Sequence, residues 1–229
     1  MGRVILSGGA RATVPLTGIK LATIAEGQTV KLLENGVEVE FYVAKHNYES
    51  ALNGTGRTLL IRKYNYGTRS WDNGNVNSYA SSDIDEWLNS TYKNMFDTTA
   101  KAAIGTTNFY YTPGNGNNTV GTLTRSVFIV SAAELNQTNK SGINFEGSVL
   151  PNYSKYVWVS NTDGTQCCPW TRSPDTTTTT NVWGFYAGGN ACGSYGANTV
   201  DSQIGPFPAF TLPSNSVFDE ETLIFKGVA

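Results

Sequence analysis

Few residues in this sequence could carry out catalysis or bind a metal. The chain has one histidine, His46, so a histidine-based metal site or a Ser/His/Asp triad would have to rely on that residue alone. No motif of either kind surrounds His46, which follows an expected strand, and we interpret it as a surface or capping histidine. No glycine loop of the phosphate-binding kind stands between a strand and a helix. We therefore expect no catalytic residue, no metal and no cofactor.

The cysteines do not predict a disulfide framework. There are three, Cys167, Cys168 and Cys192, and two of them are adjacent in the chain. An odd number in this arrangement is typical of buried or unreactive thiols, which is our interpretation. A bridge between Cys168 and Cys192 stays open as an alternative.

Carboxylates offer a second route to catalysis. Glycoside hydrolysis needs only two carboxyl groups that meet in space, so a cell-wall hydrolase remains a lesser alternative. The best clustered acids, Asp83, Asp85 and Glu86, are better explained as charges in the first turn of a helix, where the helix dipole favours anions.

Aromatic residues in the last third of the chain are the most informative side chains. Tyrosine and tryptophan give large contact areas at low entropic cost, and neighbouring Asn, Ser and Gly supply adaptable hydrogen bonds. Aromatic faces also stack on sugar rings. We assign Trp158 and Phe128 to the core, because both lie in apolar strands. The candidate ligand-binding residues are Trp183, Phe185, Tyr186, Asn190, Ser194 and Tyr195.

The elements that position these residues are mostly expected to be strands. Residues 26–46 predict a hairpin that turns at Glu34-Asn35-Gly36. Two helices are expected in the first half. One begins at Ser81 or Ser82, because Ser82 stands three residues before Asp85, as in a capping box. The other spans residues 97–104. Strands and long polar loops follow, which favours an α+β class.

Composition limits the classes of partner. Charged residues make up 15% of the chain, against about 25% in an average globular protein. With a net charge of -2, the chain has no excess of positive charge that would attract nucleic acid. No apolar stretch approaches the ~20 residues of a membrane helix, so we expect no membrane insertion.

The apolar run at the N-terminus is too short for a signal peptide, which predicts synthesis in a cytoplasm. The polar, weakly charged composition is nevertheless typical of extracellular adhesins and virion proteins. A phage virion protein, made in the host cytoplasm and assembled into the particle, satisfies both expectations.

Four segments, in the same order, resemble one domain family. Residues 77–89 resemble its Tyr, short polar cap and helix that ends in Trp-Leu-Asn, and residues 127–134 resemble a later apolar strand that leads into Ser and Glu. Residues 170–174 resemble a Trp-Leu-Arg-Ser-Pro motif, and residues 207–212 a closing Arg-Pro-Ala-Phe segment. The likeness covers about residues 26–215. The family has no assigned function and is frequent in prophage tail regions and in surface proteins of gut bacteria.

This sequence departs from the family pattern in two places. Phe207 stands where the family usually has Arg, and Thr171 replaces an apolar residue. The family is thought to share the C-type lectin-like fold of formylglycine-generating enzymes and phage tropism determinants. Those enzymes need dedicated redox cysteines, which the pair Cys167-Cys168 does not reproduce.

The resemblance implies an α+β, C-type lectin-like domain over residues 26–229, with two helices in the first half and a last third rich in strands and loops. Residues 1–25 would precede it as an extended N-terminal arm. Residues 175–205 would form a recognition loop region, and Arg172 would be structural, holding the base of that region to the core.

The function implied is that of a phage virion structural protein of the tail-fibre or baseplate type, which displays this domain to a host-surface glycan or protein. Residues 1–25 would anchor it to other virion proteins. A homo-oligomer, a trimer by analogy with fibres, would be expected. The alternative is a purely structural decoration, collar or tail subunit.

Overall fold

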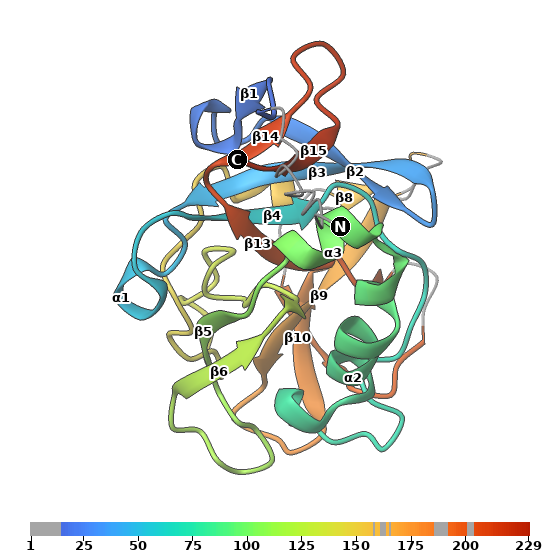
Figure 1. The fold of residues 1–229 in the computed structure, drawn as a ribbon. Coiled ribbons are helices and arrows are strands. Elements are labelled where there is room, and N and C mark those ends of the chain that lie inside the picture. Colours follow the sequence, from blue (N-terminus) through green and yellow to red (C-terminus); the bar gives the residue numbers. More distant parts are fainter. Residues whose placement is uncertain (1–14, 158, 161–163, 165, 186–191, 201–203) are drawn as a thin grey trace, which may run out of the picture.

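The largest sheet of the fold is antiparallel and is built from both ends of the chain. The computed structural model describes residues 15–229, except 158, 161–163, 165, 186–191 and 201–203. The sheet crosses the upper part of Figure 1 in the order β2-β3-β4-β13-β7. Its strands are β2 (Thr29–Glu34), β3 (Val37–His46), β4 (Arg57–Arg62), β7 (Val127–Phe128) and β13 (Ala209–Pro213).

The expected hairpin between β2 and β3 is confirmed. Asn35 and Gly36 both have positive φ, 50° and 80°, which a two-residue turn of this kind requires. Along β2, partly buried and fully buried side chains alternate, so one face of the hairpin contributes Val30 and Leu32 to the core.

Three further sheets lie around this one in the described residues. The second sheet has the order β11-β10-β9-β12, and β8 also pairs with β9. A hairpin, β5-β6, lies at the left of Figure 1, and a small sheet, β1-β14-β15, lies at its top. Their strands are β1 (Ile19–Lys20), β5 (Thr107–Tyr111), β6 (Gly121–Arg125), β8 (Val159–Ser160), β9 (Gln166–Pro174), β10 (Asn181–Phe185), β11 (Cys192–Gly196), β12 (Ile204–Gly205), β14 (Ser216–Phe218) and β15 (Phe225–Val228).

Helices are short, and the two that the sequence predicts are present. The helix α2 (Asp83–Ser90) begins after Ser82, whose Oγ accepts a hydrogen bond from the backbone N–H of Asp85. The helix α3 (Thr98–Ala103) begins after Asp97, which caps it through its carboxylate. The other helical segments are single turns: α1 (Ser50–Asn53), α4 (Ser154–Val157) and the 3₁₀ turns η1 (Leu21–Thr23), η2 (Tyr79–Ser81) and η3 (Tyr92–Met95).

The α+β, lectin-like class expected from the sequence is nevertheless wrong. Among the described residues, strand accounts for 36% and helix for 16%, and the strands form four small sheets. Capping and periodicity correctly locate a helix, but they do not predict what fraction of the residues will be helical. Here α2 and α3 have only eight and six residues, and most remaining elements pair as strands.

The described part of the predicted N-terminal arm packs against the domain. The strand β1 pairs with β14, and Leu21 and Ile24 are buried in the core. Residues 1–14 lie outside the described residues, so an anchoring role for residues 1–25 stays a prediction.

The core is rich in aromatic rings. Phe41, Phe96 and Phe210 pack together over the large sheet, with ring centroids 5.1 to 6.0 Å apart. Phe128 is fully buried, as predicted, whereas Trp158 lies outside the described residues. No helix in the described part of the chain is long and apolar enough to cross a membrane.

Candidate functional site

The candidate binding residues near β10 and β11 do not share one face. Trp183 and Ser194 are opposite each other across the two strands, whereas Tyr195 is opposite Val182 on the other face. The edge of the Tyr195 ring meets Trp170, with centroids 6.1 Å apart.

Two of these residues make internal hydrogen bonds. Trp183 is only 8% exposed, and its Nε1 donates to the carbonyl of Gly142 at 3.0 Å. The hydroxyl of Ser194 donates to Asp175 Oδ2 at 2.6 Å. Both side chains therefore tie loops to the second sheet.

The remaining candidates are not described. Phe185 ends β10, but its side chain lies outside the described residues, and so do Tyr186 and Asn190. A binding surface made of the six residues stays a prediction.

The histidine, which the sequence suggested to be a surface or capping residue, is instead the last residue of β3 and joins two neighbouring segments. His46 is partly buried, and its Nε2 lies 3.0 Å from the carbonyl oxygen of Ile24. A carbonyl can only accept, so Nε2 donates, and Nδ1 accepts from the hydroxyl of Thr58 at 3.0 Å. Among the described residues, no group of three or more His, Cys, Asp or Glu side chains could hold a metal ion.

The clustered acids lie where the sequence places them. Asp83, Asp85 and Glu86 occupy the first turn of α2. Asp85 also accepts a hydrogen bond of 2.7 Å from Arg125 Nε. Burial raises the pKa of Asp85 to about 6, although the hydrogen bond and charge of Arg125 oppose this rise. The cysteines Cys167 and Cys168 are buried, in agreement with their interpretation.

A buried ionic network lies between the sheets, centred on Arg172. Its guanidinium is fully buried and donates from Nη1 to Glu134 Oε2 at 2.7 Å. The same group donates to the carbonyls of Tyr110, Ile129 and Glu146 at 2.9 to 3.1 Å. The positive charge is therefore compensated and all three nitrogens of the group are used, which a buried arginine requires. The predicted structural role of Arg172 is confirmed.

Two buried carboxylates complete this network. Glu134 also accepts from the hydroxyl of Tyr48 at 2.5 Å, and burial together with the negative charge of Glu134 raises the pKa of Tyr48. Glu146 accepts from the backbone N–H of Thr112 at 2.5 Å and from the hydroxyl of Ser173. Burial raises the pKa of Glu146, although the charge of Arg172 opposes this rise.

A surface pocket of about 250 Å³ lies directly outside the network. Tyr110, Phe145, Gly147 and Ser148 line it, and Glu146 lies between two of them in the chain. We call these four residues the aromatic pocket. Phe145 is 73% exposed, the highest value among the large apolar side chains that the structure describes. Removal of this ring from water would be favourable.

Backbone geometry shapes one wall of the aromatic pocket. Gly147 has φ of 112°, a conformation that residues with a Cβ rarely adopt. A Cβ there would lie 3.1 Å from Glu134 Oε1 and 3.4 Å from Glu49 Oε1. The loop can therefore follow this path close to the buried carboxylates only because residue 147 is glycine.

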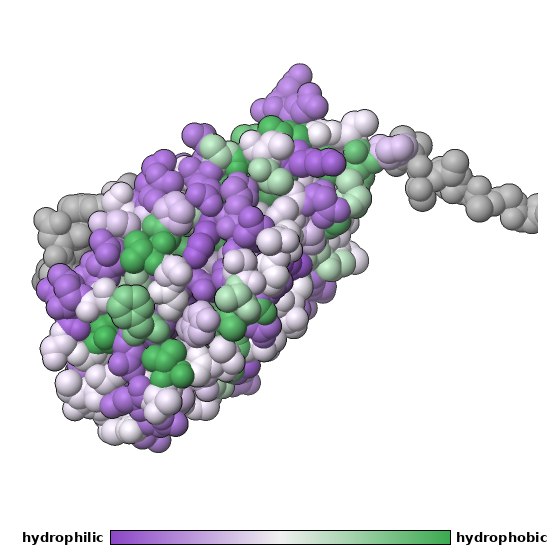
Figure 2. All heavy atoms as spheres, turned by 90° about the vertical axis from the view of Figure 1, so that its left-hand side faces the viewer, coloured by the Kyte–Doolittle hydropathy of each residue, from purple (hydrophilic) through white to green (hydrophobic). Residues whose placement is uncertain are grey.

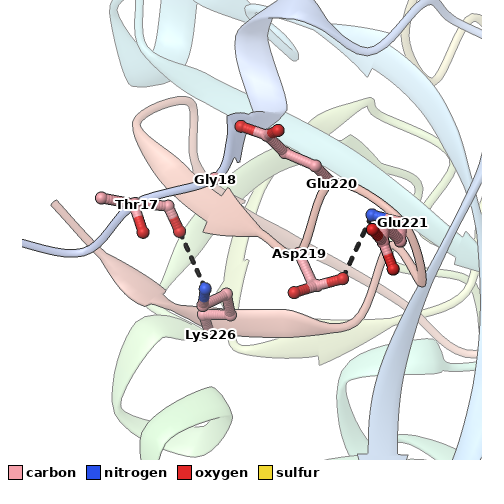
Figure 3. A pocket seen from close by; sticks show the side chains of 6 residues that line it. All are labelled: Thr17, Gly18, Asp219, Glu220, Glu221 and Lys226. Carbon is pink, nitrogen blue, oxygen red and sulfur yellow. Dashed lines mark hydrogen bonds between the residues drawn. The ribbon is translucent and has the colours of Figure 1, made fainter.

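A second pocket, of about 290 Å³, is hydrophilic and joins the two ends of the described chain. Thr17, Gly18, Asp219, Glu220, Glu221 and Lys226 line it. Figure 3 shows Lys226 directed at Thr17, whose carbonyl it reaches at 2.9 Å, and Asp219 bonded to the backbone of Glu221. These contacts close the β14–β15 turn against the segment before β1, which is a structural role.

Part of the protein surface is drawn in Figure 2 by the hydropathy of its residues. Figure 2 shows apolar side chains in separate small patches among polar ones on the face drawn.

Two residues of the aromatic pocket, Tyr110 and Phe145, are not among the candidate binding residues that the sequence predicted. A signal was present for Phe145, since this large apolar residue stands between Asn144 and Glu146 in a short segment bounded by glycines. No comparable signal marked Tyr110, which lies in an ordinary strand.

Comparison with known proteins identifies a family. A family model described as "Domain of unknown function (DUF6273)" matches residues 55–214. This range contains the aromatic pocket, Arg172, Glu134 and Glu146, but not Tyr48 or the lining of the hydrophilic pocket. No curated protein and no solved structure matches the chain.

Proposed function

We propose that this chain, which belongs to the DUF6273 family of domains of unknown function, is a non-enzymatic binding domain that recognises carbohydrate on a cell surface. The observation that carries this proposal is the exposed ring of Phe145 at the rim of a pocket inside the family domain. A sugar ring has an apolar face of C–H groups, and these pack on the electron-rich face of an aromatic ring.

The size of the aromatic pocket favours one sugar residue. Pockets that enclose a drug-sized ligand have volumes of about 300–1,000 Å³, and this one has about 250 Å³. The exposed hydroxyl of Ser148 is a polar group beside the aromatic face, as a sugar site requires. A single ring of a longer chain would fit, with the rest of the polymer over the surrounding surface.

The charge of the chain favours a neutral ligand. With a net charge of -2 and 15% charged residues, the protein has little long-range attraction for polyanions. Glu134 and Glu146 are fully buried and hydrogen-bonded within the network, which gives them a structural role. We therefore prefer binding to hydrolysis.

As the setting, we propose a phage virion, in a tail fibre or baseplate, with the ligand on the host envelope. A shallow pocket binds one sugar weakly, and a homo-oligomer would gain avidity from several copies. Residues 1–25 would attach the domain to other virion proteins. In the alternative, a decoration or collar subunit, Phe145 and Val149, both exposed in this monomer, would be covered by neighbouring subunits.

The test is binding of labelled protein to an array of bacterial surface polysaccharides and to host cells, beside the variant Phe145→Ala. Because Phe145 is exposed, the variant should keep its stability within about 0.5 kcal/mol and lose binding. The control Val37→Ala removes an apolar side chain that is 64% exposed, from the β2–β3 hairpin, and should bind normally.

Two results would contradict the proposal. Equal binding by Phe145→Ala and the wild type would exclude the aromatic pocket and return attention to Tyr186 and Tyr195. Binding by neither protein, even after oligomerisation, would favour the structural subunit. Mass spectrometry of purified virions tests the setting, which fails if the chain is absent from the particle.

A further inference from the structure

The two walls of the aromatic pocket come from segments far apart in the sequence. Tyr110 lies in β5, and Phe145 lies in the loop before α4. Arg172, in β9, bridges the two segments through main-chain carbonyls. Its Nε donates to the carbonyl of Tyr110 and its Nη2 to the carbonyl of Glu146, each at 2.9 Å.

The guanidinium is itself held from the other side. Nη1 bonds to Glu134 and to the carbonyl of Ile129, and the ring of Phe109 lies against the group at 4.7 Å. Since the guanidinium is planar and its N–H directions are fixed, it sets the separation of the two carbonyls that it joins. An ammonium group lacks this fork, so lysine would not reproduce the geometry.

From these contacts we infer that Arg172 is a positioning residue for the aromatic pocket: it fixes the distance between the wall that carries Tyr110 and the wall that carries Phe145. The inference rests on the proposed function, since it gives the network under the pocket a role in binding. Arg172 does not touch the ligand; it acts through the two carbonyls.

The experiment compares Arg172→Lys with Arg62→Lys. Arg62 is a matched control, because it is also buried, bonds to a carboxylate, Glu34, and donates to two carbonyls, those of Tyr64 and Asn65. It lies outside the lining of the aromatic pocket. Two readouts are used: amide hydrogen exchange over residues 143–150, and binding of methyl β-D-galactopyranoside, followed by NMR titration.

Both variants should lose stability, but only Arg172→Lys should raise exchange over residues 143–150 in the folded state. It should also weaken binding of the galactoside by about threefold to tenfold, which is the change in affinity that the loss of about one hydrogen bond produces. Arg62→Lys should leave both readouts at the wild-type values. Equal exchange over residues 143–150 in the two variants would overturn the inference.

The readouts separate failure of this inference from failure of the proposed function. If the wild type binds no galactoside but Arg172→Lys raises exchange locally, Arg172 positions the walls and the proposed ligand class is wrong. If Arg172→Lys does not fold, Ser131→Ala replaces it. Ser131 Oγ is a second donor to the carbonyl of Glu146, at 2.9 Å. In Ser131→Ala the guanidinium of Arg172 still holds this carbonyl, so exchange over residues 143–150 should stay at the wild-type value. A clear rise would show that Ser131, and not Arg172, holds the loop, and would overturn the inference.

Discussion

Removal of the charge of Glu134 should destabilise the protein far more than removal of a surface charge. The substitution Glu134→Gln keeps the size of the side chain but leaves the buried guanidinium of Arg172 without its bonded counter-ion. Breaking a buried ion pair in this way costs about 3–5 kcal/mol. The control Glu38→Gln breaks a pair with Lys31 in which the side chains are 36% and 47% exposed, and should cost about 0–1 kcal/mol.

Urea unfolding measured by tryptophan fluorescence suits this comparison, because Trp71 and Trp170 are buried in the core. The wild type should have a free energy of unfolding of about 5–15 kcal/mol, so Glu134→Gln should shift the midpoint strongly or unfold the chain. Equal and small losses in the two variants would refute the reasoning, since they would show that Glu146 or water compensates Arg172 without Glu134.

Two further predictions concern the backbone and pH. Gly147→Ala should destabilise the protein by about 1–3 kcal/mol, from strain at positive φ and contact with Glu134, whereas Gly36→Ala, with open space around it, should cost less in the same urea titration. The folded pKa of Asp85 is about 6, above the ordinary value of 3.8, so its stabilising contribution is complete below about pH 4 and is lost as pH rises through 6. At about 1.4 kcal/mol per pKa unit, the wild type should lose up to about 3 kcal/mol over this range relative to Asp85→Asn, and parallel pH profiles would disprove this assignment.

Much of the local structure was predictable because it depends on residues close in sequence. The Asn35-Gly36 turn follows from the tolerance of these two residues for positive φ. The starts of α2 and α3 follow from side-chain caps within three residues of the helix. The structural role of Arg172 was also inferred correctly, from the resemblance to the family pattern. His46, in contrast, lies within β3 and is not the surface or capping residue that the absence of a motif suggested.

The class of the fold was not predictable from the same signals. Two capped segments in the first half suggested an α+β protein, but among the described residues strand is more than twice as abundant as helix. Short strands such as β1 and β12, with two residues each, have no periodicity that a sequence pattern can detect. They exist only because a neighbouring strand supplies their hydrogen-bond partners.

The sequence by itself therefore determined the turn, the helix caps, the scarcity of catalytic side chains and the weak charge. Tertiary structure alone decided the site. Arg172 joins acceptors that lie 26 to 62 residues before it in the chain, and it places Phe145 beside Tyr110 as a consequence. Caps and turns arise from interactions within a few residues, whereas a buried guanidinium finds its acceptors only after the sheets have assembled around it.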